Sequence, residues 1–217
     1  MPRILFLLYT VLLMTASPLW AQSSAFKEAI TLDRQGFIVE TIEPWKAFLE
    51  TRPAPELDVF GHIKLCISLT KSGNLGDALK LAHKAAARYP DNFHAQFNLA
   101  NMAGAIQKYS EAVTAFETLI KLDPNQGLSY VGLGLALFGE GKTERALDVL
   151  REVRTLFKKQ KNIAWYQKVR IMIGQLKSFA PYPPDFSKLF LENNLENVRE
   201  NYQKSLFLDF ENSLNLP

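Results

Sequence analysis

The chain has 217 residues, of which 47% are hydrophobic and 22% are charged. This is an ordinary composition for a folded protein that is long enough to bury a sizeable core. The formal charge of +3 is too small to indicate nucleic-acid binding by itself. A single cysteine, Cys66, excludes an intramolecular disulfide. Beyond the first residues, no apolar run reaches the length of a membrane-spanning helix, so we expect no integral membrane segment in the mature chain.

Residues 1–21 differ from the rest of the sequence. Arg3 is their only charge, and a mainly apolar run from Ile4 to Met14 follows it. The segment then ends in Leu19-Trp20-Ala21, with a small residue last. This order is typical of a secretory signal peptide cleaved near Ala21, and it predicts an exported protein, periplasmic or secreted. An uncleaved anchor or a buried first helix are the alternatives.

Three blocks of 34 residues follow one another without a gap, at 59–92, 93–126 and 127–160. Equivalent positions hold similar residues. Leucine stands at the seventh position, small residues stand at the eighth and twentieth, and the turn position is mostly glycine: Leu65, Leu99, Leu133; Cys66, Ala100, Gly134; Ala78, Ala112, Ala146; Gly73, Gln107, Gly141. Small residues let two antiparallel helices approach closely, and glycine relaxes the turn between them. Each block is therefore predicted to be a helix pair, and successive pairs should stack.

The blocks resemble the tetratricopeptide-repeat family. The resemblance is closest in the middle block, through Leu99, Ala100, Tyr109, Ala112, Phe116, Leu122, Asp123 and Pro124. That block departs from the family pattern at Gln96 and at Gln107. The resemblance implies an all-α fold, an α-solenoid of antiparallel helix pairs in a superhelix. It also implies protein–protein interaction as the role, with no catalytic activity.

Weaker patterns flank the three repeats. Residues 22–58 fit a divergent N-terminal repeat in which Pro44 is expected to kink or shorten the second helix. The last five of these residues, 54–58, are expected to form a short inserted corner. Residues 161–179 are predicted to be a capping helix. After a proline-rich break, residues 180–217 are predicted to be a helical C-terminal tail. Its apolar stripe is Leu195, Val198, Tyr202 and Leu206.

No group of residues has the spacing of a catalytic or metal-binding motif. The histidines are His62, His83 and His94; His62 and His94 do not have the i, i+4 spacing of a metal-binding pair, and no acid-rich segment follows either of them. We expect no cofactor and no enzyme activity. Cys66 occupies a position where the sister repeats have alanine or glycine. We therefore interpret it as a small packing residue rather than a redox thiol.

The resemblance implies that the first helix of each repeat lines a concave groove. The corresponding residues of this chain are Phe60, Ile63, Lys64, Ile67, Lys71, His94, Phe97, Asn98, Asn101, Leu128, Val131, Leu135 and Phe138. This set is largely apolar, with two lysines and two asparagines as polar anchors. One interpretation is that the groove binds a partner segment, extended or helical, whose backbone the asparagines would hydrogen-bond. The other is that the tail fills the groove, or docks on a second copy of the protein.

Two further surfaces bear on the partner. Some family members hold a C-terminal carboxylate through residues of three repeats, but only Asn98 matches that pattern here, which argues against such a ligand. A basic stretch runs through Arg151, Arg154, Lys158, Lys159, Lys161, Lys168 and Arg170. It could meet anionic lipid headgroups or an acidic protein, or it could be a solvated helix face.

The sequence thus predicts a non-enzymatic scaffold or adaptor in the cell envelope that binds an unknown protein partner, as an assembly factor for an envelope complex. It does not predict a nucleic-acid partner. The alternative function is a lipid or small-ligand carrier in which the tail is a lid over an apolar groove.

Overall fold

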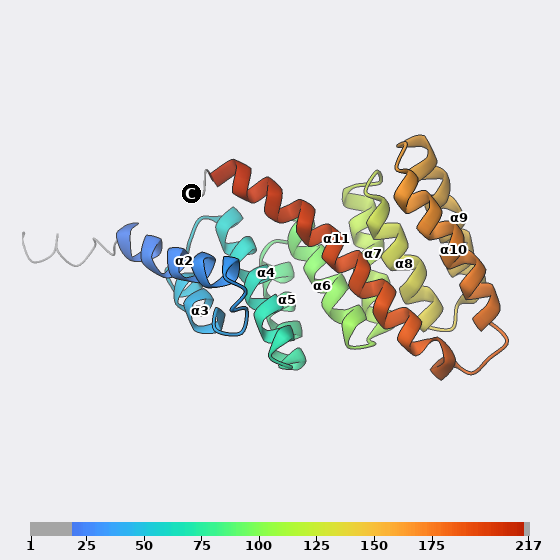
Figure 1. Ribbon diagram of the computed structural model, residues 1–217, viewed down its shortest axis with the longest axis horizontal. Coiled ribbons are helices and arrows are strands. Elements are labelled where there is room, and N and C mark those ends of the chain that lie inside the picture. The colour runs from blue at the N-terminus through green and yellow to red at the C-terminus, as the bar shows by residue number, and fades with distance from the viewer. Residues whose placement is uncertain (1–18, 215–217) are drawn as a thin grey trace, which may run out of the picture. The chain divides into compact units, whose positions relative to one another are not determined.

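The structure is a computed structural model that describes the backbone of residues 19–214 and the side chains of residues 24–208 and 210. Every regular element in this part is a helix (Figure 1). The elements are α2 (Leu19–Arg34), α3 (Ile42–Glu50), α4 (Pro55–Lys71), α5 (Leu75–Arg88), α6 (Phe93–Ala105), α7 (Tyr109–Leu122), α8 (Gly127–Gly139), α9 (Thr143–Lys159), α10 (Ile163–Phe179), η1 (Pro184–Ser187) and α11 (Lys188–Leu214). Short turns join them into helix pairs, and the predicted all-α solenoid is confirmed.

The chain divides into two compact units, Met1–Ala78 and Leu79–Pro217. None of the helices in the described ranges is long and apolar enough to cross a bilayer. The predicted signal peptide lies outside the described residues except at its last three positions, which open α2. Export therefore stays a prediction.

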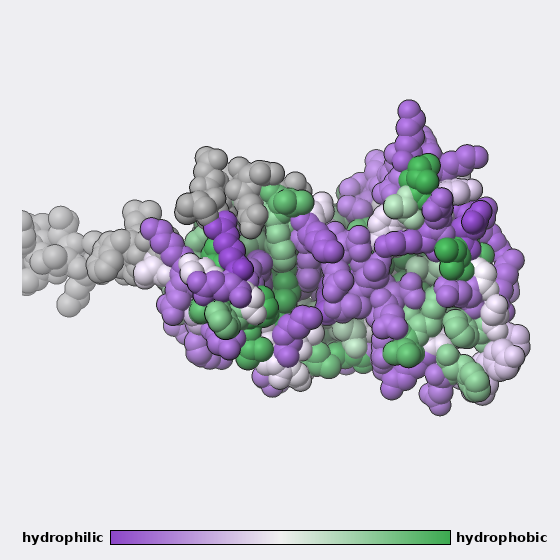
Figure 2. Space-filling view, in the orientation of Figure 1, coloured by the Kyte–Doolittle hydropathy of each residue, from purple (hydrophilic) through white to green (hydrophobic). Residues whose placement is uncertain are grey.

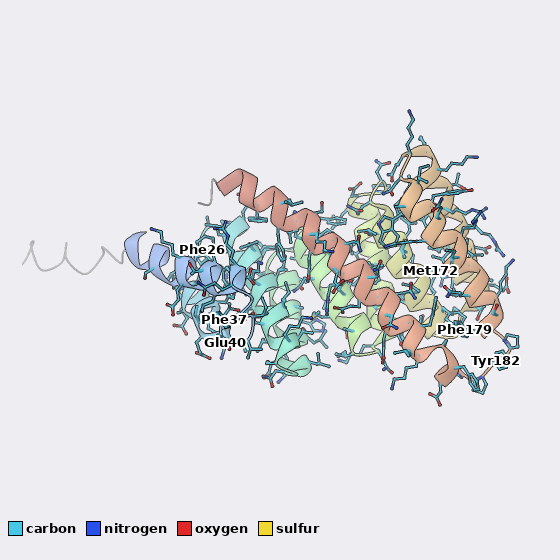
Figure 3. The ribbon with its side chains drawn as sticks, in the orientation of Figure 1. Phe26, Phe37, Glu40, Met172, Phe179 and Tyr182 are labelled. Carbon is cyan, nitrogen blue, oxygen red and sulfur yellow. The ribbon has the colours of Figure 1, made fainter. Side chains whose placement is uncertain are left out.

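In the first unit, α2 and α3 form a helix pair that packs on α4. An aromatic cluster holds the three helices together: Phe26 lies 5.8 Å from Trp45 and 5.0 Å from Phe48, and Trp45 lies 5.8 Å from Phe60, between ring centroids. Figure 3 labels Phe26 among these helices. Thr41 stands where the repeat pattern has a small residue. It is fully buried, and its hydroxyl is 2.6 Å from that of Ser68.

Two expectations for this unit were wrong, both because of where proline is tolerated. The first helical turn needs no backbone N–H donor, so proline there costs no hydrogen bond. Pro55 is the first residue of α4, so the expected corner at 54–58 is mostly helix. Pro44 lies in the first turn of α3, which begins at Ile42, so the helix is not interrupted.

The turn position of the repeats has a left-handed backbone. Its φ is +83° at Gly73, +62° at Gln107 and +81° at Gly141. Glycine adopts this conformation without steric cost, but a residue with a Cβ does not. Gln107 therefore occupies a strained position that the sister repeats give to glycine.

In the second unit, successive helices from α6 to α10 pack side by side, and small residues let α8 approach α7 and α9 closely. A Cβ added at Gly132 would lie 2.2 Å from the ring of Phe116, and one at Gly134 would lie 2.8 Å from Leu150. Ala112 and Ala146 are fully buried. The close approach of the helices thus depends on the absence of larger side chains at these positions. The pair formed by α9 and α10 is joined by stacking of Phe157 on Trp165, with centroids 5.9 Å apart.

After α10 the chain leaves the repeat pattern. The proline-rich segment 180–184 ends the helix, η1 turns the chain, and α11 then runs back over the unit. Figure 1 shows this last helix, in red, lying across α6 and α8, and it packs against both. The tail is thus helical, as predicted, and it covers the face that the first helices of two repeats present.

Replacing Ala112 by leucine tests the packing between α7 and its neighbours. Ala112 has no exposed surface, so three extra carbon atoms must force the helices apart. We expect Ala112→Leu to lower the free energy of unfolding by about 1–3 kcal/mol, measured by chemical denaturation. Ala87→Leu is the matched control, because Ala87 is exposed on α5. Equal stability of the two variants would contradict this close packing of the helices.

Candidate functional site

The candidate site is the face of the second unit formed by α6 and α8, together with the helix that covers it. The predicted groove residues of these two helices are not open to solvent. Phe97, Val131 and Leu135 have no exposed surface, and Asn98, Asn101, Leu128 and Phe138 are buried. His94 is half-buried. Of the two interpretations of this groove, the structure agrees with the one in which the tail fills it.

The helix α11 contributes one apolar stripe to this contact. The members are spaced four, three, four and four residues apart, which places them on one side of a helix, and each is at most 6% exposed: Leu191, Leu195, Val198, Tyr202 and Leu206. The sequence pattern had indicated the last four of them. The opposite side of the helix carries exposed residues such as Asn193 and Glu200. One side of this helix is thus a continuous apolar stripe, and that side lies in the groove.

Tyr202 makes the central contact. Its ring stacks on that of Phe97, with centroids 3.6 Å apart and planes inclined by 22°. Its hydroxyl is hydrogen-bonded to Nδ1 of His94. Phe93 adds a third ring, 6.0 Å from that of Tyr202. The ring of Tyr202 thus packs on the apolar residues of the groove, while its hydroxyl hydrogen-bonds the histidine at the edge.

The middle of the groove is less completely filled. The predicted bond from Asn101 to a peptide backbone stays a prediction; the Nδ2 atom of Asn101 donates to the backbone carbonyl of Phe97, 2.8 Å away. Its Oδ1 is buried without a hydrogen-bond partner among the described residues. A cavity of about 110 Å³ lies here between α6 and α11, lined by Asn101, Ala105, Leu195 and Arg199 among others. It is smaller than the roughly 300–1,000 Å³ of pockets that hold drug-sized ligands, so it gives no support to a carrier function.

Gly104 lies on α6 directly under Leu195 of α11. A Cβ at this position would lie 3.4 Å from Leu195, and the three nearest atoms within 4 Å all belong to that leucine. A side chain here would therefore meet the covering helix before it met the repeats. Nothing in the sequence pattern indicates that Leu195 lies over Gly104.

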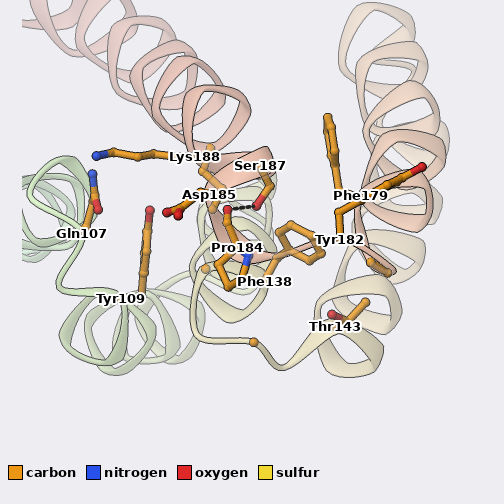
Figure 4. A pocket seen from close by; sticks show the side chains of 14 residues that line it. Gln107, Tyr109, Phe138, Thr143, Phe179, Tyr182, Pro184, Asp185, Ser187 and Lys188 are labelled. Carbon is orange, nitrogen blue, oxygen red and sulfur yellow. Dashed lines mark hydrogen bonds between the residues drawn. The ribbon is translucent and has the colours of Figure 1, made fainter.

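The start of α11 is held by the turns of the repeats. Gln107 donates from Nε2 to Oε1 of Glu192, 2.9 Å away. This bond gives a reason for a glutamine at a left-handed position, since glycine would have no side chain to reach α11. Close by, Tyr109 and Phe138 line a cavity of about 250 Å³ with Tyr182, Ser187 and other residues of the connecting segment (Figure 4). Burial, and secondarily the negative charge of Glu192, raises the pKa of Tyr109.

The groove residues of the first repeat belong to the other unit and have different surroundings. Phe60 and Ile63 are buried in its core, Ile67 is half-buried, and Lys71 is exposed. Lys64 was expected to be a polar anchor for a ligand. It is instead buried in an ion pair with Asp33 of α2, with Nζ 2.5 Å from the carboxylate oxygen.

Comparison with known proteins agrees with the repeat architecture. A family model of the tetratricopeptide repeat matches residues 69–136. The chain is a tetratricopeptide-repeat protein. It is 31% identical over 113 residues to "Protein CTR9 homolog" of Arabidopsis thaliana, a stretch that is 52% of this chain. The match spans only 10% of that relative's length.

Solved structures of tetratricopeptide-repeat type have a similar fold. MamA from Desulfovibrio magneticus RS-1 superposes with a TM-score of 0.61 over 85% of this chain and 96% of that one, at 17% identity. A tetratricopeptide repeat protein from Parabacteroides merdae gives 0.56 over 90% and 80%, also at 17% identity. The TPR2B domain of yeast Sti1, in a complex with pHsp70, gives 0.51 over 57% and 97%, at 17% identity. At these identities the likeness concerns the fold alone. The tetratricopeptide-repeat fold generally serves as a scaffold for protein–protein interaction.

Shortening Leu195 tests how α11 is held on this tetratricopeptide-repeat unit. The residue is 4% exposed, so Leu195→Ala should weaken the docking of the helix by roughly 2 kcal/mol or more. We expect faster cleavage by a protease within residues 180–208, while α6 to α9 stay resistant. Leu208→Ala makes the same change on the same helix at a residue that is 60% exposed, and it should be cleaved like the unaltered protein. Identical cleavage of both variants would mean that Leu195 does not hold the helix.

Proposed function

We propose that this protein is a non-enzymatic scaffold whose groove in the second unit binds an amphipathic helix of a partner protein, and that α11 occupies this groove until the partner helix replaces it. The proposal rests on the way in which α11 binds in the groove. A helix whose apolar residues recur every three or four positions lies in the groove and stacks Tyr202 on Phe97. Insertion of an amphipathic helix into an apolar groove is a common mode of peptide recognition.

Several features favour exchange over a permanent fit. The covering helix is not part of any repeat, and residues 180–187, which contain three prolines, join it to α10. The repeat helices also pack directly on each other, α6 on α7, α7 on α8 and α8 on α9. A buried Asn101 oxygen without a partner among the described residues and a small cavity remain under it. These are imperfections that a better-fitting helix could remove.

The ligand that we propose for this groove is a helix, and not the C-terminal carboxylate that some tetratricopeptide-repeat proteins bind. The TPR2B domain of yeast Sti1 forms a complex with pHsp70. In this chain only Asn98 matches the carboxylate-binding pattern, and it is buried. We therefore propose recognition of a helix along its length rather than recognition of a chain end.

A labelled peptide with the sequence of residues 188–208 tests whether the groove accepts a helix in trans. In the unaltered protein the tethered α11 competes at an effective concentration of the order of millimolar, so the peptide should bind weakly. In Leu195→Ala the tethered helix is weakened, and we expect binding to become about tenfold tighter or more, measured by fluorescence anisotropy with the full-length protein. Leu208→Ala should bind like the unaltered protein.

Gly104→Leu tests whether the peptide binds in the groove itself or simply binds any variant in which α11 is released. A leucine at this position should displace α11 and also block the peptide, because both helices need the space over Gly104. We therefore expect Gly104→Leu to expose α11 to protease and yet to bind no peptide. If Leu195→Ala binds no better than the unaltered protein, or if Gly104→Leu binds as well as Leu195→Ala, the exchange proposal fails.

We further propose that the protein acts in the cell envelope, as an assembly factor for an envelope complex. The support is the signal-peptide pattern of residues 1–21, with its apolar run and terminal small residue. The test is to identify the N-terminal residue and the compartment of the protein expressed in a bacterium. Export predicts a periplasmic chain that begins near Gln22. An intact N-terminus in the cytoplasmic fraction would refute this part of the proposal.

A further inference from the structure

The segment between α9 and α11 has an unusual charge distribution. Residues 153–184 contain seven lysines and arginines and no aspartate or glutamate. Most of this segment is α10 with the ends that join it to its neighbours. A stretch of 32 residues with bases alone is a local source of positive potential in a protein whose overall charge is only +3.

The exposed side of α10 combines some of these bases with large apolar residues. Trp165, Val169, Met172, Ile173 and Leu176 are buried on the inner side. On the outer side, Ile163 and Ile171 are 58% and 57% exposed, and Arg170 and Lys177 lie on the same side of the helix. Lys168 is turned away from this set, since its Nζ donates to Asn197 of α11 at 3.0 Å. The outer side is therefore both basic and apolar.

The corner between α10 and α11 extends this surface. Tyr182 and Phe186 stack with centroids 5.3 Å apart, yet they are 56% and 64% exposed, and Leu189 is 67% exposed. Figure 3 labels Tyr182 at this corner, and Figure 2 shows hydrophobic side chains standing out from a mainly hydrophilic surface over α10 and near the corner. Lys188 lies beside these residues, and Asp185 is the exposed acid among them. Five large apolar side chains are thus left in water within residues 163–189.

We propose that the outer side of α10 and this corner form a surface that binds an anionic phospholipid membrane. Lysine and arginine would meet the lipid phosphates, while Phe186, Leu189 and Ile171 would enter the boundary between headgroups and acyl chains. Peripheral proteins combine these two contributions, because a few bases or a few apolar side chains alone bind a membrane weakly. The proposal concerns a surface that does not include the groove under α11 and does not depend on its occupant.

The arrangement suits a membrane better than an acidic protein. The exposed apolar residues stand singly among bases along α10 and protrude at a proline-bounded corner, whereas a protein interface usually has a contiguous apolar centre with a polar rim. The aromatic residues at the corner stack on each other and are not spread over bases as a platform for nucleotides. A fluid lipid surface can admit separate side chains without a matching pocket.

Vesicle sedimentation tests the proposal with the full-length protein. Vesicles of equal parts phosphatidylglycerol and phosphatidylcholine should sediment the protein at about 0.1 M salt, and pure phosphatidylcholine should not. Arg170→Glu with Lys177→Glu should lower the partition coefficient by about tenfold or more. Phe186→Ser with Leu189→Ser should lower it as well, because the insertion is lost. The control Lys84→Glu with Lys121→Glu makes the same change in net charge at exposed residues of α5 and α7 and should sediment normally.

Circular dichroism should show that all these variants are folded, since every altered side chain is exposed. Failure of the unaltered protein to sediment with anionic vesicles would overturn the proposal, as would equal loss of sedimentation in the control variant. Binding to soluble polyglutamate without binding to vesicles would also overturn it, and would indicate an acidic protein as the partner.

Discussion

The packing of α11 on the apolar face of α6 and α8 is the interaction on which the second unit depends. Each repeat buries its small residues between its own two helices, as Ala112 and Gly134 show. Phe97, Val131 and Leu135 belong to the face that α11 covers, and all three are fully buried. Burial of a phenylalanine or leucine side chain is worth about 1.5–3 kcal/mol, so an open groove of this composition would carry a substantial free-energy cost. The last helix, α11, covers these side chains and so avoids this cost.

The same interaction explains which side chains α11 turns toward the groove. Its buried stripe is apolar, and Tyr202 supplies a hydroxyl for His94 at the edge of the groove. A partner helix in this groove would have to pack on the same Phe97 ring and over the same Gly104. The residues of α11 that make these contacts therefore indicate which side chains a partner helix needs. The basic and apolar side of α10 is a separate surface. A protein held at a membrane by that side could still exchange its groove helix.

Much of the architecture could be predicted, because each repeat has the same residue types at the same positions. The recurrence of leucine, small residues and glycine every 34 positions fixes the register of the helix pairs, and the stripe of Leu195, Val198, Tyr202 and Leu206 predicts a helix in the tail. What the sequence left open depends on contacts between distant residues. Nothing local shows that Tyr202 stacks on Phe97, that Lys64 pairs with Asp33, or that Gln107 reaches Glu192. Pro44 and Pro55 were misjudged for a different reason, since their effect depends on whether they fall in the first turn of a helix or further along it.

Hydrogen exchange of the full-length protein, read by mass spectrometry, tests most directly whether α11 is a replaceable occupant. Backbone amides exchange through local or global opening, and the protection of each helix reports the free energy of the opening that exposes it. If α11 leaves the groove while the repeats stay folded, its amides will exchange markedly faster than those of α6 and α8. If its amides are instead protected as strongly as those of α6 and α8, then α11 is a permanent part of the core, and exchange for a partner helix is contradicted.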